Sequence, residues 1–147
     1  MNHKIYVHHQ QQQLLSHYAI FRVIQLDILP NGHLIHQSDL EEKGTAVNIN
    51  MDDIMYLTPF NKFKHNNTLI RLKGLENHCY VIRDTLLNLE KLLNSNIYVR
   101  SHYSYIVNIN FADWFLPPNR IFMGNYVLPV GKHYVENLKE KLFPRNN

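Results

Sequence analysis

Apolar and polar residues alternate along most of the chain with the two-residue period of β-strands. The alternation is clearest in AVNIN (residues 46–50), and short apolar runs bounded by turn residues follow it. Such runs are typical of half-buried and buried strands. Further strands are predicted at residues 54–57, 68–74, 78–82, 97–100, 104–110, 120–123 and 126–130. The pattern therefore predicts a mainly β fold made of many short strands.

The first 44 residues have a different pattern. Residues 1–17 contain the polar run HHQQQQ, which fits a loose arm or the start of a helix. Two apolar segments then flank Pro30-Asn31-Gly32, and Asn-Gly is a strong signal for a tight hairpin. The first of these segments is also long enough for a helix. Because Ser38 to Gly44 is polar and acidic, we predict an N-terminal extension at 1–44 and a domain at 45–147.

Two segments have the period of helices. In residues 84–95, Leu86, Leu89 and Leu93 recur on one helical face, and Asp84 is the predicted N-cap. From about Lys132 the period changes again, and a short amphipathic helix is predicted before Pro144. We interpret both helices as packing elements, which adds one internal and one C-terminal helix to the β fold.

Composition narrows the class of protein. The chain is 45% apolar and 18% charged, which is enough for a hydrophobic core. Lys and Arg number 5 against 1 acidic residue in residues 60–83, and 6 against 3 in residues 97–147. This basic charge favours an anionic partner such as nucleic acid. The single cysteine, Cys79, excludes a disulfide framework and a cysteine-based zinc site, and no metal or cofactor is expected.

The chain shows neither an apolar signal segment nor a run long enough to span a membrane. The expectation is a cytoplasmic protein with no membrane partner.

Residues 97–130 contain Tyr98, Arg100, His102, Ser104, Val107 and Asn108 at a fixed spacing within eleven residues. These six positions match the Phe/Tyr-x-Arg-x-His-x-Ser-x-x-Val-Asn core of the LytTR-type DNA-binding domain of bacterial response regulators, which this part of the chain resembles. Upstream, DDIMYL (52–57) resembles the family's Asp-Ile-aromatic strand and TLLNLEKLL its helix. Downstream, LPVGKHYVENL resembles the closing segment. The resemblance covers about residues 45 to 143.

The resemblance implies an elongated, multi-stranded β fold and no enzymatic activity. It implies a transcription regulator that binds double-stranded promoter DNA sequence-specifically, by loops in the major grooves. Paired direct repeats are the expected target. Matching the family's contact regions position by position predicts a DNA-binding set of Lys62, Lys64, His65, Arg100, His102, Tyr103, Lys132 and His133. Their side chains can bond phosphates or base edges.

Three departures from the family pattern are visible. The family often has Arg where Tyr103 stands, and Ser-Arg-Arg where Gly131, Lys132 and His133 stand. Lys, His and Tyr lack the bidentate fork of Arg, so different bases or a modest affinity are expected. Relatives also carry a receiver domain upstream, and residues 1–44 are too few for one. Regulation is therefore expected through abundance, a homodimer contact or a regulatory protein that binds the N-terminal segment.

Rival functions remain open on the sequence alone. A protein-interaction module that has lost specific DNA binding would explain the missing arginines. RNA or single-strand binding would need exposed stacking aromatics beside basic residues. A catalytic triad of His102, Ser104 and Asp113 is disfavoured, because triads are defined by geometry and these residues lie within one short stretch of strands.

Overall fold

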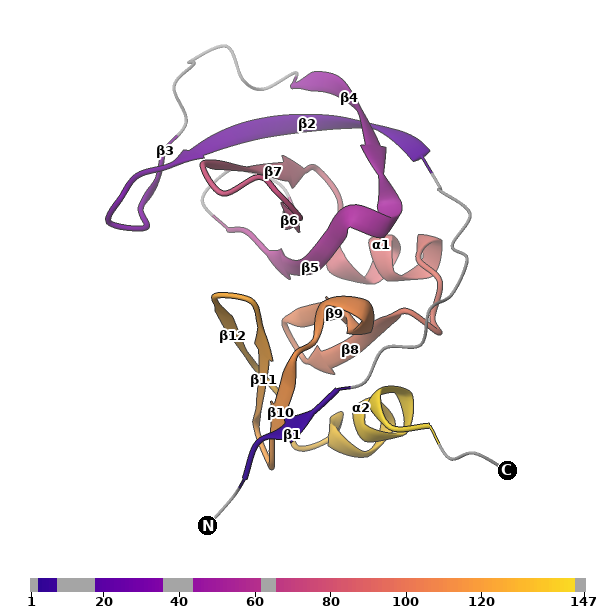
Figure 1. The fold of residues 1–147 in the computed structure, drawn as a ribbon. Helices are drawn as coiled ribbons and strands as arrows, with labels where there is room; N and C mark the ends of the chain where they lie inside the picture. The colour runs from indigo at the N-terminus through magenta and orange to yellow at the C-terminus, as the bar shows by residue number, and fades with distance from the viewer. Residues whose placement is uncertain (1–2, 8–17, 36–43, 62–65, 145–147) are drawn as a thin grey trace. The chain divides into compact units, whose positions relative to one another are not determined.

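The computed structural model describes residues 3–7, 18–35, 44–61 and 66–144. The predicted contacts Lys62, Lys64 and His65, and the polar run at 8–13, lie outside the described residues. The chain divides into two compact units, Leu14–Leu89 and Met1–Gln13 with Glu90–Asn147, and each is described by itself. Antiparallel strands dominate both units, which confirms the mainly β prediction (Figure 1).

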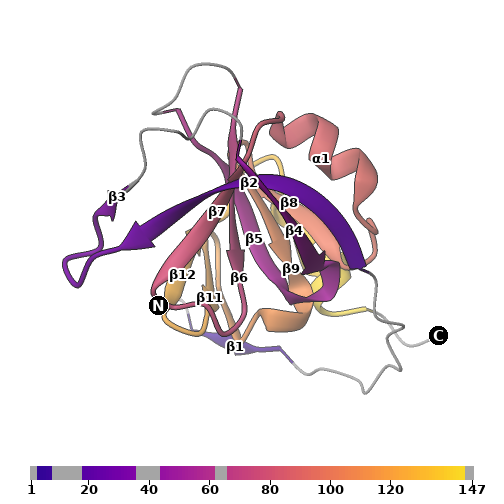
Figure 2. The same ribbon diagram turned by 90° about the horizontal axis from the view of Figure 1, so that it is seen from above.

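The unit Leu14–Leu89 is an antiparallel sheet around one long strand. Its strands are β2 (Tyr18–Ile28), β3 (Leu34–Ile35), β4 (Thr45–Asn50), β5 (Ile54–Pro59), β6 (Thr68–Leu72) and β7 (His78–Ile82). They follow the order β3-β2-β7-β6-β5, with β4 also paired to β2. Figures 1 and 2 show β2 as a long curved strand with β3 at one end. A 3-10 turn at Met51–Asp53 joins β4 to β5, where a break was predicted.

The predicted hairpin around Asn31-Gly32 is confirmed. β2 and β3 pair antiparallel, with Asp27 opposite Ile35 and Ile28 opposite Leu34. Gly32 has a φ of 85°, which a residue with a side chain rarely adopts. β2 also pairs with β4 and with β7, so a strand of the predicted extension belongs to the same sheet as strands from the predicted domain.

The internal helix α1 runs over Leu86–Leu92, inside the predicted segment. Its N-cap is Thr85, whose Oγ1 accepts a 3.1 Å hydrogen bond from the main-chain N–H of Asn88. The prediction of Asp84 as the N-cap was therefore wrong by one residue. The Asp84 carboxylate instead accepts bonds from the N–H of Thr85 and the side-chain amide of Asn88. Leu86 and Leu89 are buried, as the apolar stripe predicted.

The second unit holds a hairpin, a four-stranded sheet and a helix. The hairpin is β8 (Tyr98–His102) with β9 (Tyr105–Asn108), and a 3-10 turn at Ile109–Phe111 follows it. The sheet has the order β1 (Ile5–Tyr6), β10 (Trp114–Leu116), β11 (Arg120–Met123) and β12 (Tyr126–Pro129). The C-terminal helix α2 spans Val135–Leu142, where the helical period was predicted.

One face of this sheet forms the core of the second unit. Phe115, Ile121 and Leu128 stand opposite one another on β10, β11 and β12 and are almost fully buried. Phe115 stacks against Phe143 beyond the end of α2, with ring centroids 6.4 Å apart. Leu138 and Leu142 of α2 are buried as well. The helix is thus held by the apolar face that its sequence predicted.

Two features of this unit were not predicted. Ile5–Tyr6 forms a short strand on β10, whereas the sequence indicated an arm or a helix there. The turn between β8 and β9 lies at Tyr103-Ser104, because Ser101 and His102 still belong to β8; the prediction placed the turn at 101–103.

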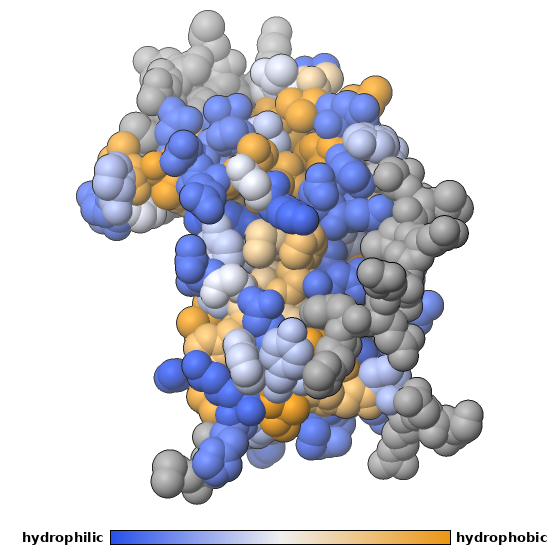
Figure 3. Space-filling view, in the orientation of Figure 1, coloured by the Kyte–Doolittle hydropathy of each residue, from blue (hydrophilic) through white to orange (hydrophobic). Residues whose placement is uncertain are grey.

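No helix within the described ranges is both long and apolar enough to cross a membrane. On the face seen in Figure 3, apolar and polar side chains are interspersed. Several large apolar side chains are exposed, among them Ile20 and Tyr18 on β2 and Trp114 on β10.

Candidate nucleic-acid interface

The turn between β8 and β9 is held in place by Arg100. The guanidinium Nη1 donates a 2.6 Å bond to the main-chain carbonyl of Tyr103. Nη2 and Nε donate to the two carboxylate oxygens of Glu90, at 3.0 and 3.3 Å. This is the bidentate geometry that arginine alone can form. Arg100 therefore fixes the backbone at the tip of the hairpin to Glu90 in the second half of α1.

His102, at the end of β8, supports the same turn. Its Nδ1 accepts a 3.0 Å hydrogen bond from the main-chain N–H of Ser104. Because Nδ1 accepts, the proton of the neutral ring is assigned to Nε2. The ring also lies edge-on to Tyr105 across the hairpin, with centroids 5.9 Å apart. His102, which the resemblance predicted as a DNA-binding residue, thus holds its own loop through a backbone hydrogen bond.

The segment that leads into α2 lies directly beside this hairpin. The N–H of Gly131 donates a 2.7 Å bond to the carbonyl of Ser101, and the Ser101 hydroxyl donates to the carbonyl of Pro129 at 3.2 Å. A Cβ atom added to Gly131 would lie 3.1 Å from Tyr134 Cδ2 and 3.5 Å from His102 Cδ2. Glycine thus permits a close approach of the two segments, and its φ is not in the left-handed region.

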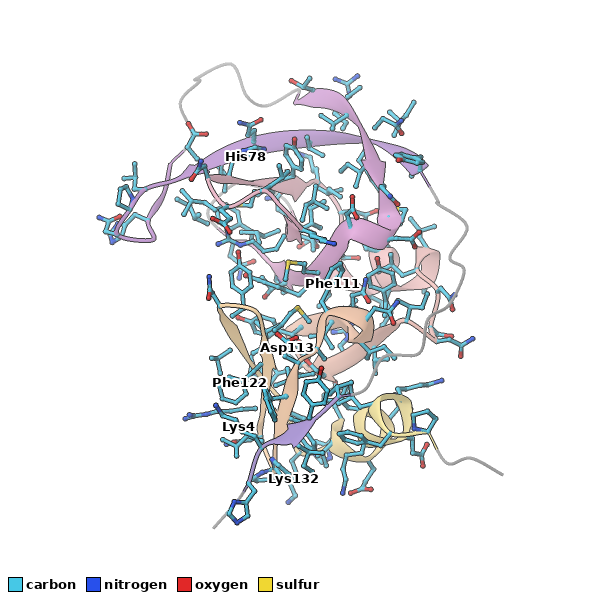
Figure 4. The ribbon with its side chains drawn as sticks, in the orientation of Figure 1. Lys4, His78, Phe111, Asp113, Phe122 and Lys132 are labelled. Atoms are coloured by element: carbon cyan, nitrogen blue, oxygen red, sulfur yellow. The ribbon has the colours of Figure 1, made fainter. Side chains whose placement is uncertain are left out.

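This packing brings together three of the predicted contact residues. Tyr103, at the hairpin tip, is 78% exposed, and Lys132 and His133, just after Gly131, are also exposed. Figure 4 shows Lys132 projecting away from the ribbon. A phenol, an ammonium group and an imidazole are therefore presented from two adjoining segments. All three can bond phosphate oxygens or base-edge acceptors.

The other predicted DNA-binding residues are either partly buried and already hydrogen-bonded or lie outside the described residues. Arg100 is largely buried, its side chain being 17% exposed, and its guanidinium already bonds Glu90 and Tyr103. His102 is half-buried and bonded as described above. Lys62, Lys64 and His65 lie outside the described residues, so their assignment stays a prediction. Asn108 of the core motif ends β9, and its side-chain oxygen accepts from the N–H of Asn110 to cap the next turn.

The sequence reasoning missed three residues that support this corner: Glu90, Ser101 and Gly131. Ser101 and Gly131 form its central hydrogen bond, and Glu90 holds Arg100. A fully buried serine inside a strand is a weak signal for such a role, since its hydroxyl must find a partner. The glycine had been interpreted only as a departure from the family pattern.

His102, Ser104 and Asp113 are not linked as a catalytic triad. His102 accepts from the main chain of Ser104 rather than from its hydroxyl, and the Asp113 carboxylate accepts from the N–H of Gly124. The described residues contain no group of three or more His, Cys, Asp or Glu side chains that would hold a metal ion. His8 and His9 lie outside the described residues.

The architecture is one of antiparallel β-strands with two short helices, and exposed polar groups lie on the loops before α2 and between β8 and β9. Residues 44–143 match the model of the LytTr DNA-binding domain family, and the chain belongs to that family. A solved LytTr DNA-binding domain, from a Bacillus cereus protein described as a methyl-accepting/DNA response regulator, has the same fold. The match has a TM-score of 0.57 and 21% identity, and covers 83% of this chain and 97% of that one.

Curated proteins with similar sequences include two named Sensory transduction protein LytT. The Sensory transduction protein LytT of Bacillus cereus is 30% identical over 113 residues, which are 74% of this chain and 43% of that protein. The protein of that name from Bacillus subtilis is 33% identical over 70 residues, which are 44% of this chain and 29% of its own length. The chain thus spans less than half the length of these relatives.

Proposed function

We propose that the protein is a transcription regulator that binds double-stranded DNA sequence-specifically and contacts the major groove through loops. The observation that carries the proposal is the Gly131–Ser101 hydrogen bond, which sets the Tyr103 turn beside Lys132 and His133 in a member of a DNA-binding domain family. Membership in the LytTr DNA-binding domain family is the reason for proposing DNA as the ligand. The hydrogen bond explains how one corner of the molecule presents several DNA-compatible groups at once.

Within this proposal the residues have two kinds of role. Lys132 neutralises a phosphate or donates to guanine, and Tyr103 and His133 bond phosphate or base edges. Arg100 and His102 act mainly as positioning residues, because their nitrogen atoms already hold the hairpin turn. Lys62, Lys64 and His65 are proposed as a further contact group. Paired direct repeats are the proposed target, occupied by two protomers.

The test begins with a selection of duplex fragments from the genome that encodes the protein. Affinity for a selected duplex is then measured by fluorescence anisotropy for the wild type and for Lys132→Glu. Losing one charge-assisted hydrogen bond, worth about 1.5 kcal/mol or more, lowers the affinity roughly tenfold. Tyr103→Ala is expected to weaken binding as well, since its exposed ring and hydroxyl are lost from the same corner.

Lys139→Glu is the matched control. Lys139 is an exposed cation on α2, and its substitution changes the net charge by the same amount. A large loss in Lys132→Glu with a small one in Lys139→Glu supports a localised interface. Equal losses in both variants, or a selection that enriches no duplex, would contradict the proposal and favour a domain that has lost specific DNA binding.

A further inference from the structure

The second face of the β1-β10-β11-β12 sheet carries a row of large apolar side chains. The strand register places Tyr6 opposite Trp114, Trp114 opposite Phe122, and Phe122 opposite Val127. Directly opposed residues in a sheet point to the same side, so these four form one row across four strands. We call this row the aromatic ladder. The T-shaped contact of Tyr6 and Trp114, with centroids 5.1 Å apart, confirms that two of the rings touch.

Three of the four side chains of the aromatic ladder are exposed and Phe122 is half-buried, whereas the row behind it is buried. Tyr6, Trp114 and Val127 are 50%, 39% and 52% exposed, while Phe115 and Ile121 on the opposite face are 0% exposed. A contiguous row of this size marks an interaction surface more often than an ordinary solvent face. Isolated exposed apolar residues would need no such explanation.

The charge on this face has one sign. Lys4 holds its ammonium nitrogen 4.4 Å from the centroid of the Phe122 ring; Figure 4 labels both residues. Arg120 is exposed in the next row, where it stands opposite Leu116 and Pro129. Among the described residues in these two rows and at Lys4, two are cationic and none is acidic. The face is therefore complementary to an anion that also carries flat apolar groups.

We propose that this face binds an unpaired strand of DNA. Nucleic-acid bases stack on aromatic side chains, and their phosphates are attracted to neighbouring lysine and arginine. Four strands at about 4.8 Å spacing make a row roughly 14 Å across, enough for two or three stacked bases. A duplex cannot bind in this way, because its base faces are already covered by one another. A second copy of the chain fits less well, since Lys4 and Arg120 of both copies would meet.

This site is distinct from the proposed duplex interface, which uses Tyr103, Lys132 and His133. The inference therefore goes beyond the proposed function, and either can fail without the other. Binding of both forms of DNA would suit a regulator that acts where promoter strands separate.

Trp114 is the only tryptophan in the chain, so its emission reports on the aromatic ladder alone. The full chain is titrated with a short oligo(dT), and with a duplex of the same length, while Trp114 emission is followed. The proposal predicts saturable quenching by oligo(dT) as bases stack on the indole. Lys4→Glu and Arg120→Glu should weaken this binding, and Lys139→Glu, on the helix packed against the opposite face, should leave it nearly unchanged.

A second measurement does not depend on emission. With a labelled oligo(dT) followed by anisotropy, Trp114→Ala should weaken binding roughly 5- to 150-fold, the effect of losing one base–aromatic stack. Lys132→Glu should leave oligo(dT) binding unchanged, and Trp114→Ala should leave duplex binding unchanged. Circular dichroism and the thermal midpoint show whether each variant is folded.

Several results would overturn the inference. Trp114 emission that oligo(dT) does not alter excludes base stacking at this site. Equal weakening by Lys139→Glu indicates non-specific charge attraction. Tighter binding of oligo(U) assigns the face to RNA, and emission that depends on protein concentration alone assigns it to a second copy of the chain.

Discussion

The guanidinium of Arg100 donates a 2.6 Å hydrogen bond to the main-chain carbonyl of Tyr103, three residues further along the hairpin. Its other nitrogens are bonded to Glu90, so the side chain joins the turn to the end of α1. Tyr103 itself is exposed at the tip. A residue of the family's core motif therefore bonds the backbone of its neighbour. This bond is the basis for proposing that Arg100 positions the turn.

Arg100→Lys separates these two roles. Lysine keeps the charge but loses the fork that bonds Glu90 and Tyr103 together. We expect a several-fold loss of duplex affinity with an unchanged slope of log affinity against log salt, because no phosphate contact is removed. Anisotropy titrations at several salt concentrations measure both quantities. If Arg100 bonds phosphate directly, Arg100→Lys will be nearly silent and Arg100→Ala will reduce the slope by about 0.9.

His102 is expected to stabilise the hairpin through Nδ1. In His102→Leu the N–H of Ser104 loses its acceptor, and the free energy of unfolding should fall by about 1 kcal/mol. His102→Asn places a carbonyl oxygen close to the position of Nδ1 and should retain most of that stability. Urea unfolding followed by circular dichroism measures the difference. Equal stabilities of the two variants would argue that this hydrogen bond contributes nothing.

Cys79 lies in β7 and is 1% exposed. Burial raises the pKa of its thiol, and the nearby charge of Arg71 only partly opposes this. The folded state thus disfavours the thiolate, so this contribution to stability is complete below the pKa of the unfolded thiol, about 8.5, and falls as the pH rises beyond it. The free energy of unfolding of the wild type, relative to that of Cys79→Ala, should therefore decrease as the pH is raised above about 8.5. Urea unfolding at neutral and alkaline pH measures this difference.

The same burial predicts slow chemistry at this thiol. A disulfide reagent should modify Cys79 in the native protein far more slowly than in urea, because the thiolate is the reactive form and the side chain is enclosed. Rapid native-state labelling would show that β7 opens readily. It would contradict the buried position of Cys79 described here.

Local sequence signals predicted the parts of the fold that local chemistry decides. Asn31-Gly32 predicted a hairpin because both residues tolerate the turn, and the leucine spacing predicted the buried face of α1. β1 was missed because two residues carry no period, and its pairing partner is Phe115, more than a hundred residues away. The N-cap was misplaced because Asp84 and Thr85 are both good caps, and only the geometry selects between them.

In the candidate site, too, some residues were predicted from the sequence and others were not. The family resemblance indicated Tyr103, Lys132 and His133, and the structure sets their segments side by side. The sequence did not predict that Glu90 would bond Arg100 or that Gly131 would pack on His102, because these contacts depend on how separate elements meet. The aromatic ladder could not be predicted from the sequence either, because its residues come from four strands whose register only the structure shows.

The central claim is specific recognition of duplex DNA. It is tested most directly by titrating the protein into a labelled duplex from upstream of its own gene, with a shuffled duplex of the same composition as the comparison, at several salt concentrations. We predict tighter binding of the native sequence that persists at physiological salt, with a salt slope that counts contacted phosphates at roughly 0.9 each. Weak and equal binding of both duplexes, lost as salt rises, together with no fragment enriched from the genome, would contradict the account.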